Sequence, residues 1–393
     1  MNKFLVYFFI CLLLFLCSCE NNEKSRINIS IWLDALDKEM EFVKKSAGLF
    51  EKEYPNVKIN FKFIQFSNLK PSFIGQSKDS YEPDIIFFTN DWIGELAEKR
   101  LILPLNESVN YNDFLPITIE GLKYKNKLYA LPQSFEVIAL VYNKKLIPKP
   151  PVDIKQMIQI SQKLQKENIY GLMYDNKNFY YHFPWFYGYG GRIFDSKEKF
   201  IIPNEQAINS FQFAFSLENE YRIIPSKSNY SAMMNMFCSN QVGMIITGPW
   251  SLGEIEKNKI SYGVASLPLL ENRRHPAPFL GIKCCAISKL SRYPDTAQKI
   301  IEFFTSSKIQ KMSMTQLGIM PSLKSIYSQG KIPENLQGFY EQAKYAVPMP
   351  TTPKMKYVWQ EYNWALGRIF DNQEQIKQIL SKAAEKIKTN IER

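Results

Sequence analysis

The stretch Asn240-Gln-Val-Gly-Met-Ile-Ile-Thr-Gly-Pro-Trp250 joins a short apolar run to a turn and a bulky aromatic residue. The run from Val242 to Ile246 predicts a buried strand, because it is rich in β-branched residues and too short for a helix. Thr247-Gly248-Pro249 ends that strand, since glycine frees φ and proline lacks the N–H that a ladder needs. We expect Thr247 to cap, and Pro249 to open, a helix that runs on to Ile255.

The place of Trp250 gives this stretch a functional interpretation. Its side chain stands where a strand passes into a helix, and in open α/β sheets ligands bind outside the carboxyl ends of the strands. The structural alternative is a ring that only fills the core beneath the turn, as tryptophan often does. The stretch by itself leaves both interpretations open.

Strand and helix patterns alternate in the N-terminal part of the chain. Ile27, Ile29 and Ile31 alternate with polar residues, which is typical of a strand, whereas Met40 and Val43 begin a row with helical spacing. The expected elements are strands over 27–33, 57–63 and 84–88 and helices over 38–53 and 92–99. This order predicts an α/β sheet with largely parallel strands.

The pattern changes after Leu122. A hairpin is expected to turn at 125–127, and a strand over 136–143 would carry the carboxylate of Glu136 at its head. Asp153 is a predicted N-cap for a helix that ends at Leu164. Further helices are expected over 204–221, 228–238, 293–305, 356–370 and 373–390, with strands over 262–267 and 279–287.

The N-terminus carries a targeting segment. Met1 to Lys3 is basic, and the apolar run from Phe4 to Leu16 is too short to span a bilayer, so residues 1–18 are predicted to be a signal peptide. Leu16-Cys17-Ser18-Cys19 resembles the bacterial lipobox, which implies that Cys19 is lipidated and that 19–26 is a tether. The alternative is an ordinary signal peptide that is cleaved elsewhere.

Composition limits the remaining possibilities. The chain after the signal is too long for one hydrophobic core, which suggests two domains, and 45% hydrophobic residues exclude general disorder. The net charge is +11, but the lysines are scattered and no nucleic-acid-binding motif accompanies them. Two histidines without a recognisable metal-ligand spacing favour no metal site. Cys238, Cys284 and Cys285 are interpreted as thiols, the last two buried in a strand.

Several motifs, in this order and spacing, carry a family resemblance. They are Pro83-Asp-Ile-Ile-Phe87, Tyr142-Asn-Lys-Lys-Leu-Ile-Pro148, Gly243-Met-Ile-Ile-Thr-Gly-Pro-Trp250 and Phe279-Leu-Gly281. Residues 27–390 resemble the extracellular solute-binding proteins of family 1, and among them the maltodextrin binders. The resemblance implies an α/β, two-lobe periplasmic-binding-protein fold of type II, with a hinge and an interlobe ligand cleft. It places 27–135 and 285–327 in the N-terminal lobe and 136–284 and 328–393 in the C-terminal lobe.

The resemblance also implies a ligand-binding set. Matched position by position, it consists of Asp34, Asp37, Lys38, Phe88, Asp91, Trp92, Glu136, Asn178, Tyr180, Trp250, Trp359, Gln360 and Asn363. Asn178, Gln360 and Asn363 stand where the family has Glu, Tyr and Arg, so that side of the cleft is expected to be neutral. Trp359 and Asn363 are four residues apart and are expected to share a helix face.

The residues independently suit a sugar. Flat aromatic rings pack against the C–H faces of a sugar, and carboxylates and amides bond its hydroxyls. The predicted function is that of a lipid-anchored, substrate-binding protein of an ABC importer in the cell envelope. It would be a monomer without a cofactor or metal, binding a neutral di- or oligosaccharide and delivering it to permease subunits.

Three alternatives remain open at this stage. The solute could be a sugar phosphate or a polyol, or the protein could be a surface adhesin that binds glycans. Asp91 and Glu136 could also be the paired carboxylates of a glycosidase. No other catalytic motif supports an enzyme.

Overall fold

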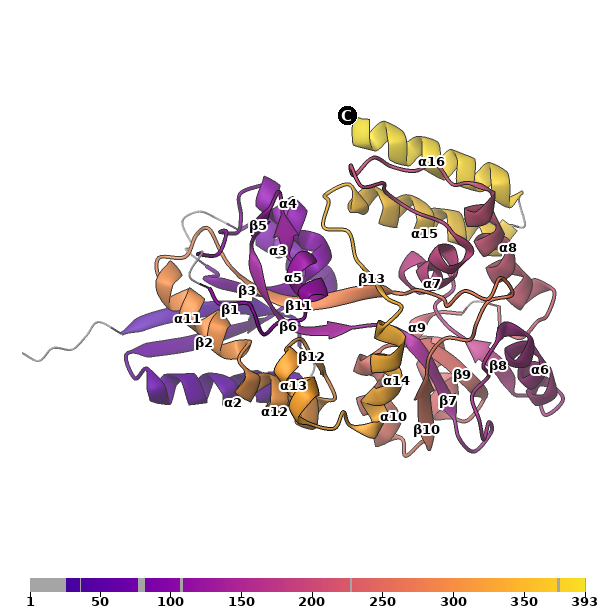
Figure 1. Ribbon diagram of the computed structural model, residues 1–393, viewed down its shortest axis with the longest axis horizontal. Helices are drawn as coiled ribbons and strands as arrows, with labels where there is room; N and C mark the ends of the chain where they lie inside the picture. Colours follow the sequence, from indigo (N-terminus) through magenta and orange to yellow (C-terminus); the bar gives the residue numbers. More distant parts are fainter. Residues whose placement is uncertain are drawn as a thin grey trace, which may run out of the picture.

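The computed structural model describes residues 26–35, 37–76, 82–106, 109–226, 228–372 and 375–392. The predicted signal peptide and Cys19 lie outside these residues. The described chain forms two lobes, with its N-terminal part on the left of Figure 1 and its middle part on the right. Each lobe is built on its own β-sheet and is flanked by helices.

A seven-stranded sheet forms the centre of the N-terminal lobe. The strand order is β12-β6-β11-β3-β1-β2, and β13 pairs with β11. The strands are β1 (Ile27–Leu33), β2 (Val57–Phe63), β3 (Ile85–Thr89), β6 (Ala130–Glu136), β11 (Phe279–Ile287), β12 (Met320–Pro321) and β13 (Val347–Pro348). β1 is parallel to β2 and β3, whereas β11 is antiparallel to β3 and β6. The expectation of parallel strands is confirmed for β1, β2 and β3, whereas β11 and β12 run in the opposite direction and make the sheet mixed.

Alternate side chains of β3 enter two different cores. Ile85 and Phe87 pack on the side of α2, α11 and α12, whereas Ile86 and Phe88 pack on the side of α3 and α4. Figure 1 shows these two groups of helices on opposite faces of the sheet. The helices of this lobe are α2 (Asp37–Glu53), α3 (Phe66–Ile74), α4 (Ile93–Glu98), α5 (Pro116–Glu120), α11 (Pro294–Phe304), α12 (Ser307–Leu317) and α13 (Lys324–Gln329). Both faces of β3 are therefore covered, which explains its continuous apolar run.

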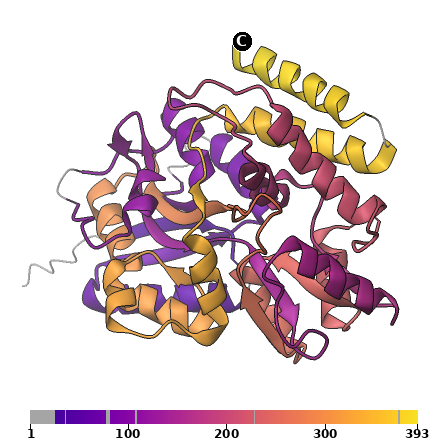
Figure 2. The ribbon, with the colours of Figure 1, turned by 45° about the vertical axis from the view of Figure 1, so that its right-hand side comes forward.

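The C-terminal lobe has a smaller sheet of order β10-β7-β9-β8. Its strands are β7 (Ala139–Asn143), β8 (Tyr170–Met173), β9 (Val242–Thr247) and β10 (Tyr262–Ala265). Its helices are α6 (Ile154–Gln165), α7 (Phe179–Tyr189), α8 (Glu205–Asn219), α9 (Tyr230–Cys238), α10 (Leu252–Lys257), α14 (Glu334–Ala343), α15 (Met355–Asn372) and α16 (Ile376–Glu392). Figure 2 shows α15 and α16, in yellow, lying together above the lobe, where α7, α8, α15 and α16 share one core.

Strand β11 links the cores of the two lobes. Phe279 at its start stacks on Phe183 of α7, with ring centroids 3.4 Å apart, and Ile287 at its end lies in the core of the N-terminal lobe. The buried Asn90 braces the same junction. Its amide nitrogen donates to the carbonyls of Gly121 and Met349, and its amide oxygen accepts from the backbone N–H of Ile282. One buried side chain therefore joins three segments of the backbone by hydrogen bonds near the place where the chain passes between the lobes.

Several expected elements differ from the structure. Glu136 ends β6 and does not head the next strand, because Val137 and Ile138 separate β6 from β7. Thr247 belongs to β9, and Gly248 takes the cap position of the short 3-10 helix η2 (Pro249–Ser251) that precedes α10. The hairpin of β4 (Lys123–Tyr124) and β5 (Lys127–Leu128) turns at Lys125 and Asn126, both with positive φ. That turn is one residue shorter than expected.

Other expectations are confirmed. The strand at β9 and the helices α2, α6, α8, α9, α11, α15 and α16 all occur within a few residues of their expected bounds. Asp153 caps α6 by accepting the N–H of Gln156 at 2.8 Å. Cys284 and Cys285 are buried free thiols. Within the described ranges, no helix is long and apolar enough to cross a bilayer.

Candidate functional site

Four neighbouring strands of the N-terminal lobe place polar groups at one edge of its sheet. Asp34 follows β1, Asp91 follows β3, and Glu136 is the last residue of β6. The Thr89 hydroxyl at the end of β3 donates to the Asp91 carboxylate at 2.7 Å. Lys283 comes from β11, whose register pairs it with Thr89 on one side and Ser134 on the other. Ligands bind at such an edge in α/β proteins, so this is the candidate site.

A lysine is surrounded by carboxylates in this region. The Lys283 ammonium lies 3.5 Å from the Glu39 carboxylate of α2. Burial raises the pKa values of Asp34 and Glu136, and Lys283 opposes both shifts. For Lys283 itself, burial lowers the pKa, but Glu39, Glu136 and Asp34 together raise it above its ordinary value. The site is therefore a mixed-charge cluster with more acidic than basic groups.

Three aromatic rings stack beside this cluster. Phe88 lies over Trp92 with ring centroids 5.8 Å apart, and Phe66 of α3 covers Trp92 at 5.4 Å. Phe88 and Trp92 are almost fully buried, whereas Phe66 is 49% exposed. Phe66 and Phe88 also line a pocket together with Asp34, Gln133 and Lys283. Trp92 therefore supports the ring that a ligand would meet and does not itself present an open face.

The C-terminal lobe contributes a second aromatic group. Tyr180 of α7 lies 6.4 Å from the ring of Trp250 and 6.4 Å from that of Phe279. Phe279 in turn contacts Trp359 of α15 at 5.6 Å. Trp250 and Trp359 are only half-buried. The group therefore keeps aromatic surface available for a ligand.

Polar groups from both lobes meet at Tyr180. Its hydroxyl is buried and has no hydrogen-bond partner in the described part of the chain. Burial, followed by the charges of Glu136 and Asp91, raises its pKa. A buried hydroxyl without a partner costs stability, and a ligand that supplies one removes this cost. The residues Asp91, Glu136 and Tyr180 can therefore act together on one polar ligand.

Not all of the predicted residues fit this picture equally well. Asp37 and Lys38 are exposed at the start of α2, and Gln360 is exposed on α15. Asn178 caps α7 by accepting the N–H of Tyr180 at 3.0 Å. Asn363 of α15 accepts the N–H of Phe179 at 2.7 Å, and Trp359 contacts the Phe179 ring, which confirms the shared helix face. Both amides thus have structural partners already.

Five residues of the candidate site are not among those that the sequence predicts. They are Glu39, Phe66, Gln133, Phe279 as an aromatic platform, and Lys283. Phe66 lies in a helix interrupted by Pro71, and Gln133 occupies an irregularity between β6 and β11. The one available signal was Lys283, a lone charge inside the apolar run of β11.

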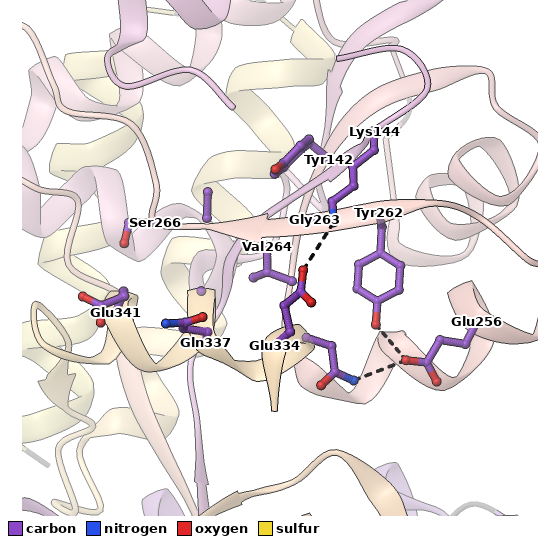
Figure 3. Close-up of a pocket in the computed structure, with 13 residues that line it drawn as sticks. Tyr142, Lys144, Glu256, Tyr262, Gly263, Val264, Ser266, Glu334, Gln337 and Glu341 are labelled. Carbon is purple, nitrogen blue, oxygen red and sulfur yellow. Dashed lines mark hydrogen bonds and ion pairs between the residues drawn. The ribbon is translucent and has the colours of Figure 1, made fainter. Parts of the chain in front are cut away.

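A groove lined by other residues of the C-terminal lobe is a separate feature. It lies between β10 and α14 and is lined by Tyr262, Glu256 and Glu334 among others (Figure 3). Glu334 lies 3.7 Å from the Lys144 ammonium, and Glu256 accepts from the Tyr262 hydroxyl at 2.7 Å. Because these carboxylates already have ion-pair or hydrogen-bond partners, we do not interpret the groove as a ligand site.

A comparison with known families decides the class of protein. The sequence pattern of the family of bacterial extracellular solute-binding proteins matches this chain over residues 34–311. The chain belongs to this family. It is a solute-binding protein and not an enzyme, so the glycosidase alternative is set aside. No group of three metal-binding side chains occurs among the residues that the structure covers.

Relatives of this solute-binding protein bind oligosaccharides. It is 27% identical to the maltotriose-binding protein of Pyrococcus abyssi, over 93% of this chain and 82% of that protein. It is 25% identical to the galactooligosaccharide-binding protein of Bacillus subtilis, over 89% of this chain and 86% of that protein.

Solved structures share the two-lobe fold. The Thermus thermophilus maltotriose-binding protein, bound with maltotriose, gives a TM-score of 0.84 at 25% identity, covering 92% of this chain and all of that one. The maltose-maltodextrin-binding protein of Alicyclobacillus acidocaldarius gives 0.83 at 27% identity, over 92% of this chain. The fold expected from the sequence is therefore confirmed.

Proposed function

We propose that this protein binds a neutral di- or oligosaccharide of the maltodextrin type between its lobes and delivers it to the permease of an ABC importer. The observation that carries the proposal is the pairing of Trp250 and Tyr180 in one lobe with Asp91 and Glu136 from the other side of the cleft. Aromatic rings pack on sugar faces and carboxylates accept hydroxyls, so the two groups suit the two kinds of surface that a sugar has. The oligosaccharide binders among its relatives support the same class of ligand.

The charges of the cleft favour an uncharged ligand. Asp34, Glu39, Asp91 and Glu136 outnumber Lys283, so a phosphate would meet net repulsion. Phosphate sites in proteins use arginine or lysine fixed toward the anion. A sugar phosphate is therefore the less favoured solute.

The cellular setting forms part of the proposal. Cys19 would carry a lipid anchor that holds the protein at a membrane, facing the periplasm or the exterior. The lobes would comprise 27–135 with 285–327, and 136–284 with 328–393. The protein would act as a monomer and present its closed form to permease subunits.

A thermal-shift screen tests the ligand class. The panel contains maltose, maltotriose, galactooligosaccharides, sugar phosphates, polyols and short peptides, each at high concentration. A ligand at 100 times its dissociation constant stabilises the protein by about 2.7 kcal/mol, which a melting curve detects. We expect neutral oligosaccharides to raise the melting temperature most. A shift only with phosphates or peptides would overturn the proposal.

A second measurement separates import from adhesion. Deletion of this gene, or of the permease genes, should abolish uptake of the oligosaccharide that gives the largest melting shift. Uptake that persists at the wild-type rate without this protein, together with unchanged binding, would favour a surface adhesin.

A further inference from the structure

The pocket around Lys283 is shaped by a β-bulge. Lys283 pairs with Ser134 of β6, but the next residue of β11, Cys284, pairs with Pro132. Gln133 is therefore left without a partner in the ladder, and it lines the pocket beside Lys283. Bulges redirect side chains and are frequent next to binding sites. Here the bulge adds an amide to a pocket that already holds a lysine and carboxylates.

Residues from several elements close the pocket. Asp34 comes from the end of β1, Glu39 from α2, and Phe66 from the start of α3. Phe66 offers an apolar face at the rim, whereas Asp34, Glu39 and Lys283 are polar groups within the pocket lining. This combination, an open aromatic face above convergent donors and acceptors, matches the surface of one sugar ring.

Lys283 is the basic group on which the charges of Asp34, Glu39 and Glu136 all act. Its side chain is 36% exposed, and the Glu39 carboxylate lies 3.5 Å from its ammonium. In the ladder, Gly281 pairs with Glu136 and Lys283 pairs with Ser134, so Lys283 and Glu136 are diagonal neighbours on one face of the sheet. The charges of both Glu136 and Asp91 act on the Tyr180 hydroxyl. Three acids and one lysine make the cluster net negative.

We propose that Lys283, paired with Glu39, is a positioning residue that keeps Asp34 and Glu136 ionised as acceptors for the hydroxyls of an uncharged sugar ring seated in this pocket. This inference rests on the proposed function. Without the lysine, the carboxylates repel one another, and Asp34 or Glu136 takes up a proton and so loses an acceptor site. The removal of an opposite charge at this range raises a carboxyl pKa by about one unit or more.

Calorimetry across a pH series tests the proposal, with maltotriose as the probe. In Lys283→Met, the pH at which the affinity has fallen to half should lie about one unit higher than in the wild type. Lys283→Arg keeps the charge and should stay near the wild type. Lys58→Met is the matched control, because it removes a lysine of the same lobe that pairs with Glu51, and neither of these two residues lines the pocket. An unchanged pH midpoint in Lys283→Met would overturn the inference.

A ligand-free measurement separates this inference from the proposed function. In Lys283→Met, raised carboxyl pKa values make the folded state bind protons more tightly, so its melting temperature should fall relative to the wild type as pH rises from 5 to 8. The double variant Glu39→Gln with Lys283→Met, which removes one of the three acids, should recover part of this loss. Glu39→Gln alone keeps the lysine and removes one acid, so the pH at which the affinity has fallen to half should move downward. This variant tests the inference if Lys283→Met does not fold. Parallel melting curves for Lys283→Met and wild type would refute the role of Lys283 whatever sugar the protein binds.

Discussion

Gly248 explains how Trp250 can lie at the end of β9. A Cβ at this position would collide with carbon atoms of the Trp250 ring. Glycine thus allows the indole to fold back over the strand end, and the ring stays half-buried beside Tyr180. The two interpretations of this tryptophan, as a ligand platform and as a core residue, can be separated by measurement.

Substitution Trp250→Ala should weaken binding of the best oligosaccharide by roughly 2–4 kcal/mol, the usual size for an aromatic anchor. Its effect on the free energy of unfolding should be smaller than the 3–5 kcal/mol typical of a buried core tryptophan. Trp185, which is fully buried, is the matched control, and Trp185→Ala should show the full stability loss. Calorimetry and denaturant melts of both variants make the comparison. Normal binding by Trp250→Ala, or its simple unfolding, would favour the interpretation of Trp250 as a core residue.

The carboxylates of the site should make binding sensitive to acid. Burial raises the pKa values of Asp91 and Glu136 above their ordinary values of 3.8 and 4.5. Since the ionised forms accept sugar hydroxyls, affinity should fall as pH decreases, and the fall should begin above pH 4.5. The stability that these two groups contribute to the unliganded protein has the opposite sign. A carboxyl pKa that is raised in the folded state stabilises that state at low pH. This stabilisation is lost as the pH rises through the pKa of the folded state. Calorimetry between pH 4.5 and 8 checks the first trend, and an affinity that does not change with pH would contradict it.

At the scale of elements, α15 supports α7 from the far end of the sequence. The side chain of Asn178 accepts the second N–H of α7, and that of Asn363 accepts the first. Helix N-termini leave such N–H groups without partners inside the helix. The late helix thus fixes the start of α7, which carries Tyr180 to the candidate site.

The variant Asn363→Ala should lower the free energy of unfolding by about 1–2 kcal/mol, because it leaves the N–H of Phe179 without its partner. It should also weaken ligand binding, since Tyr180 is the next residue of α7. Gln360→Ala is the control: this neighbour is exposed, and its substitution should stay within about 0.5 kcal/mol. Denaturant melts give both values. Equal stability of the two variants would show that the contact with Asn363 is dispensable.

The elements differ in how well the sequence predicts them. Helix α11 is amphipathic, with one buried face, and its spacing reveals it. Helix α7 is apolar and aromatic on nearly all sides and contains Pro184, so it has no periodic pattern to read. Helix α3 contains Pro71 and was missed for a related reason. Trp250, Glu136 and Tyr180 enter the candidate site as predictions from the family pattern, and they stay predictions. The bulge at Gln133 depends on strand register, which no local pattern encodes.

At the scale of the whole molecule, the two lobes must respond to the ligand as a unit. In the proposed function, Asp91 and Glu136 contact the ligand from the N-terminal lobe, and Tyr180, Trp250 and Trp359 contact it from the C-terminal lobe. A ligand shifts the lobes toward closure only by as much as it binds the closed form better. In the proposed function, contacts from both lobes supply that difference.

The proposed anchor is also a property of the whole molecule. Cys19→Ala should release the protein to the soluble fraction or leave the precursor uncleaved, because the acyl chains that hold it at the membrane are lost. Each buried methylene of such a chain contributes about 0.8 kcal/mol. Fractionation and immunoblotting of cells that express the variant check this outcome. Unchanged processing and membrane association would argue for a different means of attachment.

The place of β11 in its sheet has a consequence for biogenesis. This strand lies between β3 and β6, yet it follows both in the chain by the whole of the smaller sheet. During synthesis and export, β6 cannot reach β3 until Phe279–Ile287 has emerged, so the larger sheet stays in two pieces for most of that time. We therefore expect the larger sheet to complete its pairing only after β11 has been synthesised, late in the chain. A chain that stops at Pro278 should accordingly lack the melting transition of the N-terminal lobe.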